Sequence, residues 1–180
     1  MPNSADAANA AEPADPNNGP TNIRIITTGG TLDKVYQPAD GSLSFDHTRV
    51  PDQLLIARVS VPLTDLMAID SLDMSDEHRK QVLTCCELCV ESRLVITHGT
   101  DTMVLTAEVL AAAALNKTIV LTGAMVPLSI SGSDGAFNLG CAIGLVQALP
   151  GGVWVAMNGI ARPWNDVKKD RRRGVFTGSK

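Results

Sequence analysis

The chain has 180 residues, of which 44% are hydrophobic and only 3% aromatic, so one globular domain with an aliphatic core is expected. A formal net charge of −4 argues against nucleic acid as the main partner. No stretch is apolar for long enough to span a membrane, and the N-terminus has neither the basic start nor the apolar core of a secretory signal.

The N-terminal part of the chain combines a polar tail with a short apolar strand. Residues 1–20 are rich in Ala, Asn, Pro and Asp, which predicts a disordered tail before a single domain at residues 21–180. Residues 23–27 have the β-branched composition of a buried strand. Gly29 and Gly30 then allow a sharp turn, which would hold Thr31 at the carboxyl end of that strand, where ligands bind in open α/β sheets. Such a stretch is also typical of an ordinary strand-to-loop turn.

A long segment follows, and its function is suggested by its length. Residues 32–50 show no clear periodicity and contain Tyr36, the only tyrosine of the chain. A connection of this length in a compact domain is often a functional lid. Residues 57–69 then alternate in the manner of a strand interrupted by Pro62, and Ser75 is placed to cap a helix that we expect to run to about Glu91.

The remaining chain alternates predicted strands with predicted helices. Strands are expected at residues 94–97, 118–121 and 153–157, and helices at residues 103–115 and 136–148. The strands are continuously apolar, as strands buried on both faces are. This pattern predicts an α/β fold, a single three-layer domain with a mostly parallel sheet flanked by helices. We expect the polar, basic end with its arginines at 171–173 to be a solvated tail.

Two predicted strands end in glycine-containing turns that present threonines, Gly30-Thr31 and Gly99-Thr100. Because parallel strands end at one edge of a sheet, the two hydroxyls could converge there. A threonine hydroxyl needs a base to act as a nucleophile, and a lysine can serve when burial lowers its pKa. The candidate partners are Asp101, Lys169, Tyr36 and His98. From spacing alone, the same turns could also bind a phosphate or cap the helices that follow.

The four cysteines favour a reducing compartment over one in which disulfides form. Three of them lie on one predicted helix, and no His or Cys partners stand at the spacing of a metal site; the cysteines are Cys85, Cys86, Cys89 and Cys141. They are typical of small buried hydrophobic residues in a reducing environment. We therefore expect a cytoplasmic protein without a metal.

Five segments, in order along the chain, resemble the signatures of bacterial-type L-asparaginases. They are Thr28–Thr31 (TGGT), Asp70–Met74 (DSLDM), His98–Met103 (HGTDTM), Ser133–Leu139 (SDGAFNL) and Asp166–Lys169 (DVKK). The resemblance implies a fold like the N-terminal domain of these enzymes. It also implies hydrolysis of L-asparagine to L-aspartate and ammonia through a threonine acyl-enzyme, with no cofactor and no membrane or nucleic-acid partner.

The resemblance also implies roles for individual residues. Thr31 matches the family's nucleophile, and Thr100, Asp101 and Lys169 match its activating triad, although the adjacent Lys168 leaves the register of the last segment open. Tyr36 matches the tyrosine of the flexible lid. The implied substrate-binding residues are Gly30, Ser71, Gly99, Thr100, Asp101 and Ala124. Among them, Ser71 and Asp101 match contacts to the α-carboxylate and α-amino groups, and Ala124 matches a backbone contact near the carboxamide.

The chain departs from the family pattern at two points. Leu72 stands where many members carry a polar residue that helps to bind the substrate. The chain also stops just after the family's first domain, so we expect a short single-domain form that assembles as a homo-oligomer, a dimer or a tetramer. Two alternatives stay open: a catalytically weak amino-acid-binding or assembly domain, and an amide-hydrolysing subunit related to tRNA amidotransferases.

Overall fold

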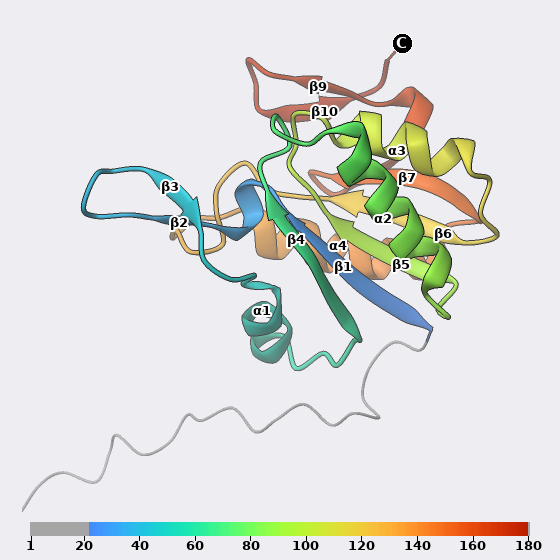
Figure 1. The fold of residues 1–180 in the computed structure, drawn as a ribbon, viewed down its shortest axis with the longest axis horizontal. Coiled ribbons are helices and arrows are strands. Elements are labelled where there is room, and N and C mark those ends of the chain that lie inside the picture. The colour runs from blue at the N-terminus through green and yellow to red at the C-terminus, as the bar shows by residue number, and fades with distance from the viewer. Residues whose placement is uncertain (1–21, 180) are drawn as a thin grey trace, which may run out of the picture.

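A six-stranded sheet forms the centre of the domain, in the order β4-β1-β5-β6-β7-β8 (Figure 1). The structure is a computed structural model that describes residues 22–179, so the predicted tail at residues 1–20 lies outside the described residues. Neighbouring strands run parallel except for β7 and β8, which are antiparallel. The strands are β1 Ile23–Gly29, β4 Leu63–Ile69, β5 Arg93–Thr97, β6 Thr118–Thr122, β7 Gly152–Met157 and β8 Ile160–Pro163.

Helices cover both faces of the sheet, and side chains of alternate strand residues fill the two interfaces. In β5, Leu94 and Ile96 pack toward α2 (Asp76–Leu88) and α3 (Met103–Ala112). Val95 packs on the opposite face, toward α1 (Val50–Ile56) and α4 (Gly135–Ala148). Each fully buried aliphatic side chain stabilises the fold by about 1.5–3 kcal/mol relative to an exposed one. The predicted three-layer α/β domain is confirmed.

Several predicted boundaries are shifted, for local reasons. Helix α2 ends at Leu88 rather than near Glu91, because Cys89 already has an extended backbone with φ −63 and ψ 133. Helix α3 ends at Ala112, two residues before Ala114 takes a positive φ of 49. The predicted alternation before Pro62 is not a strand, since Arg58 also has a positive φ, 55.

Two hairpins lie outside the central sheet. One pairs β2 (Lys34–Tyr36) with β3 (Leu43–Phe45), after the short 3-10 helix η1 (Thr31–Asp33). The other pairs β9 (Lys168–Asp170) with β10 (Val175–Thr177), after η2 (Trp164–Asp166), and lies at the top of the view in Figure 1. The expectation of a C-terminal tail is therefore wrong. The basic residues 171–173 form the exposed turn of the second hairpin, which is anchored by the buried Phe176.

Among residues 22–179, no helix combines the length and the apolar character needed to cross a membrane. Within the same range, no cluster of three or more His, Cys, Asp or Glu side chains is arranged to hold a metal ion.

Candidate active site

The turns that follow β1, β4 and β5 are packed tightly against one another at one edge of the sheet. A Cβ atom added to Gly30 would lie 2.3 Å from the backbone nitrogen of Gly99, and Gly30 has a positive φ of 75. A Cβ atom added to Gly99 would lie 2.5 Å from the Cβ and Oγ atoms of Ser71. Only glycine fits these contacts. Thr31 and Thr100, which directly follow the two glycines, are thereby held on adjacent turns.

Lys169 joins Thr100 and Asp101 from a distant part of the chain. Its Nζ donates to the Oγ1 of Thr100 at 2.7 Å and to the Oδ1 of Asp101 at 3.0 Å. The Lys169 side chain is mostly buried, with 17% exposed, whereas Lys168 is exposed. Arg171 places its Nη2 at 3.5 Å from the same Asp101 oxygen. The structure thus brings together the three residues that the resemblance assigns to a triad.

Thr31 and Tyr36 are placed differently. Thr31 begins η1, is half-buried, and has no side-chain hydrogen bond to any residue of the described chain. An unengaged hydroxyl on the turn next to Thr100 is available to a ligand. Tyr36 lies on β2 and is 56% exposed, and its hydroxyl forms no hydrogen bond within residues 22–179. Tyr36 is therefore not held in contact with the threonine turns.

An ion pair that sequence reasoning missed ties the β2–β3 hairpin to the turn after β4, which contains Asp70 and Ser71. Lys34 Nζ donates to the carboxylate of Asp70 and lies 5.7 Å from the ring centroid of Phe45. The hydrogen bond from Lys34, the amide of Leu72 and the nearby charge of Lys169 together hold the pKa of Asp70 below its usual value. Asp70 thus stays ionised beside Ser71, whose side chain is almost fully buried.

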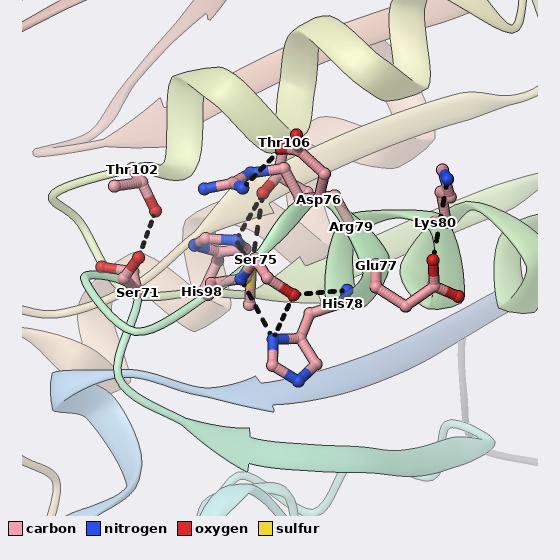
Figure 2. Close-up of polar contacts among 11 residues, drawn as sticks. Ser71, Ser75, Asp76, Glu77, His78, Arg79, Lys80, His98, Thr102 and Thr106 are labelled. Atoms are coloured by element: carbon pink, nitrogen blue, oxygen red, sulfur yellow. Dashed lines mark hydrogen bonds and ion pairs between the residues drawn. The ribbon is translucent and has the colours of Figure 1, made fainter.

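His98 is a buried neutral residue that supports the Thr100 turn. Its Nδ1 lies 2.8 Å from the carbonyl oxygen of Gly99. Its Nε2 lies 2.7 Å from the Oγ1 of Thr106 (Figure 2). Nδ1 must therefore donate, and the threonine hydroxyl donates to Nε2. Burial lowers the pKa of His98 to about 4. A residue of this kind orients a turn and is not suited to transfer protons at neutral pH, so His98 does not act as a base for the threonines.

The turn after β6, which contains Ala124, is held by an acidic residue. The Asp134 carboxylate accepts hydrogen bonds from the amides of Met125 at 2.9 Å and Val126 at 3.0 Å. It also accepts from the Nδ2 of Asn138 at 3.0 Å. Asp134 stands at the N-cap position of α4, although its side chain makes no capping bond to the helix backbone. Its carboxylate holds the Ala124 turn against the start of this helix.

Two of the four cysteines are poor nucleophiles because burial raises the pKa of their thiols. All four are free thiols. Burial is the main cause that raises the pKa of Cys85 to about 11 and of Cys86 to about 12. Both side chains are therefore protonated and unreactive at neutral pH.

Most of the chain is similar to known proteins. Residues 22–176 match the protein family described as "Asparaginase, N-terminal". The chain belongs to the asparaginase family. It is 32% identical over 163 residues to a glutaminase-asparaginase from Acinetobacter glutaminasificans, covering 82% of this chain and 49% of that protein. It is 32% identical over 173 residues to L-asparaginase 2 from Escherichia coli, covering 87% of this chain and 48% of that protein.

The asparaginase relationship also extends to structure. The thermostable L-asparaginase from Thermococcus kodakarensis superposes with a TM-score of 0.76 at 24% identity, over 87% of this chain and 50% of that one. The family resemblance drawn from the five sequence segments is confirmed. The chain spans about half the length of the curated asparaginases that it matches, so the activities in their names belong to longer proteins.

Proposed function

We propose that this asparaginase domain hydrolyses the side-chain amide of L-asparagine, giving L-aspartate and ammonia through an acyl-enzyme on Thr31. The proposal rests above all on the hydrogen bond between Lys169 Nζ and Thr100 Oγ1, reinforced by Asp101. A lysine between a hydroxyl and a carboxylate is an arrangement that can move a proton on and off that hydroxyl.

The reaction proceeds in two halves. Thr31 Oγ1 attacks the amide carbon and forms an ester bond, the C–N bond breaks, and the proton lost by the hydroxyl leaves with ammonia. Water, activated by Thr100 with Lys169 as its base, then attacks the ester carbon and releases aspartate and the free Thr31 hydroxyl. The Lys169 ammonium that forms in this step is stabilised by Asp101 at 3.0 Å.

The surrounding turns supply substrate binding in this account. Gly30, Ser71, Gly99 and Asp101 surround the amino-acid part of the substrate, with Asp101 facing its α-amino group. The amides of Met125 and Val126 are already bonded to Asp134, which leaves Ala124 as the residue of that turn that contacts the carboxamide. Tyr36 then closes over the site from the β2–β3 hairpin when substrate is bound.

We also propose that the domain acts as a closed homo-oligomer, a dimer or a tetramer. Helix α4 carries no charged residue, and Phe137 on it is 61% exposed. Ile160 in β8 is also exposed. The Phe137 ring lies against Gly159, which precedes Ile160, and we assign this apolar region of the surface to the contact between subunits. Light scattering that shows a fully active monomer at assay concentration contradicts this part of the proposal.

An ammonia-release assay with L-asparagine, and with L-glutamine as a control, tests the proposed activity. We expect release from L-asparagine that depends on the concentration of the protein. The competing function is an amino-acid-binding domain without turnover, which is favoured by the half-length match to the relatives. Calorimetric binding of L-aspartate without any ammonia release identifies that alternative and contradicts the enzyme.

A further inference from the structure

The hairpin that carries Lys169 is not part of the central sheet. Strands β9 and β10 pair only with each other, as a separate two-stranded sheet. No ladder of backbone hydrogen bonds therefore fixes Lys169 relative to Thr100, which follows β5. Since misplacing a reacting group by about 1 Å can cost about 100-fold in rate, other contacts must set the position of this hairpin.

Two asparagines provide such contacts. The Asn138 side chain, 1% exposed, donates from Nδ2 to the Gly123 carbonyl at 3.0 Å and to Asp134 at 3.0 Å. Its Oδ1 accepts the backbone amide of Asn158 at 3.0 Å. Asn138 therefore links the turn after β6, which carries Ala124, to the turn between β7 and β8.

Asn158 extends this link to the hairpin. Its Oδ1 accepts the backbone amide of Phe176 at 3.1 Å. Phe176 is the cross-strand partner of Lys169 in the β9–β10 register, and its side chain is buried. Asn158 has a positive φ of 56, a conformation that asparagine tolerates better than most residues. The bond to Phe176 thus acts directly on the strand pair that holds Lys169.

We propose that Asn138 and Asn158 are positioning residues for Lys169. Their side chains join the Ala124 turn, the β7–β8 turn and the Lys169 hairpin into one unit, so that the Lys169 amine meets Thr100 and Asp101. This inference rests on the proposed function for its kinetic consequence. The claim that Asn158 sets the position of Lys169 does not require the protein to be an enzyme.

Asn158→Gly tests the proposal, because glycine keeps the positive φ and removes only the side-chain acceptor. We expect kcat for ammonia release from L-asparagine to fall about 10- to 100-fold, with KM changed less than about 3-fold. Asn158→Asp retains an acceptor oxygen and should restore kcat to within about 3-fold of the parent.

Asn22→Gly is the matched control. Asn22 also has a positive φ, 63, and its Oδ1 also accepts a backbone amide, that of Ser92 at 2.8 Å. It precedes β1, so it lies at the opposite edge of the sheet from Thr31 and Lys169. We expect an unchanged kcat. An equal loss of kcat in Asn22→Gly and Asn158→Gly means a general effect on stability and overturns the proposal.

The NMR signal of the Lys169 side chain gives a readout that needs no turnover. With 13C-labelled lysine, assigned by Lys169→Met, the Lys169 Cε resonance should shift in Asn158→Gly and stay in place in Asn158→Asp and Asn22→Gly. A resonance that Asn158→Gly leaves unchanged overturns the proposal. If the parent protein releases no ammonia, the proposed function fails, while this resonance still decides whether Asn158 positions Lys169.

Discussion

Lys169 Nζ lies 2.7 Å from the Oγ1 of Thr100, although the two residues are 69 positions apart in the chain. Thr100 is placed by the parallel sheet, through the turn after β5, and Lys169 by a separate hairpin. Asp101 accepts a hydrogen bond from the same amine at 3.0 Å. The candidate site therefore depends on how the β9–β10 hairpin is attached to the central sheet.

Replacing Lys169 should have a far greater effect than replacing its neighbour. Lys169→Met removes the amine from Thr100 and Asp101, and we expect ammonia release to fall about 100-fold or more. Lys168 is exposed, and Lys168→Met should retain activity. Steady-state kinetics of the two variants, with folding checked by circular dichroism, provide the comparison. Greater damage from Lys168→Met would show that the wrong lysine has been assigned.

The sequence predicts the central sheet better than the two hairpins. Strands such as β5 and β6 are buried on both faces, so their continuous apolar runs reveal them. The strands of the β2–β3 and β9–β10 hairpins are three residues long and have little apolar periodicity. Their positions depend on long-range contacts, such as that between Asn158 and Phe176, which leave no local pattern in the sequence.

The same distinction applies to the candidate site. The glycines before Thr31 and Thr100 indicate the tight turns, because only glycine allows the close approach between them. Asn138 stands in the SDGAFNL segment, but it is not among the predicted site residues. Asn158 is followed by Gly159, and this pair indicates a turn but does not show which group the Asn158 side chain bonds to. Their partners are backbone groups about 20 residues away, set by the tertiary fold.

Acid should destabilise the domain partly through His98. Burial lowers the pKa of this histidine to about 4 in the folded protein, against about 6.5 in the unfolded chain. The unfolded chain therefore binds the proton first, and stability should fall as the pH drops from about 6.5 to about 4, by at most about 1.4 kcal/mol per unit. Above pH 6.5 this contribution is fully present and constant.

Urea unfolding between pH 7 and pH 4.5, compared between the parent and His98→Gln, measures this effect. The variant should be less stable at pH 7, because it loses the bonds to Gly99 and Thr106, and its stability should depend less on pH. Carboxylates contribute equally to both proteins, so the difference between the two slopes isolates His98. Parallel slopes would mean that His98 is not kept neutral by the fold.

The contact between Gly99 and Ser71 should make Gly99→Ala damaging. The added methyl would lie 2.5 Å from Ser71 Cβ and Oγ, so one turn must move. We expect a loss of about 1–3 kcal/mol in the free energy of unfolding, together with weaker L-aspartate binding. Gly140→Ala in α4 places its methyl in open space, and should stabilise the domain by about 0.5–1 kcal/mol. Equal stabilities of the two variants would contradict this packing.

The β2–β3 hairpin should be mobile only in its outer part. Its base is held by the Lys34–Asp70 ion pair and by the hydrogen bond from Ser129 Oγ to the Lys34 carbonyl at 2.9 Å. We expect fast amide hydrogen exchange at residues 36–43 without ligand, slowed by L-aspartate as Tyr36 closes over the site. Slow exchange in the free protein, unchanged by L-aspartate, would show that this hairpin is not a lid.

Ammonia release by Thr31→Ala, measured beside the parent protein, tests the proposed mechanism most directly. The Thr31 hydroxyl has no partner within the described chain, so its removal should leave the fold intact. Losing a covalent nucleophile removes the reaction path rather than a binding contact. We predict no detectable turnover by a folded Thr31→Ala protein that still binds L-aspartate. Turnover at the parental rate by that variant would contradict the assignment of Thr31 as the nucleophile.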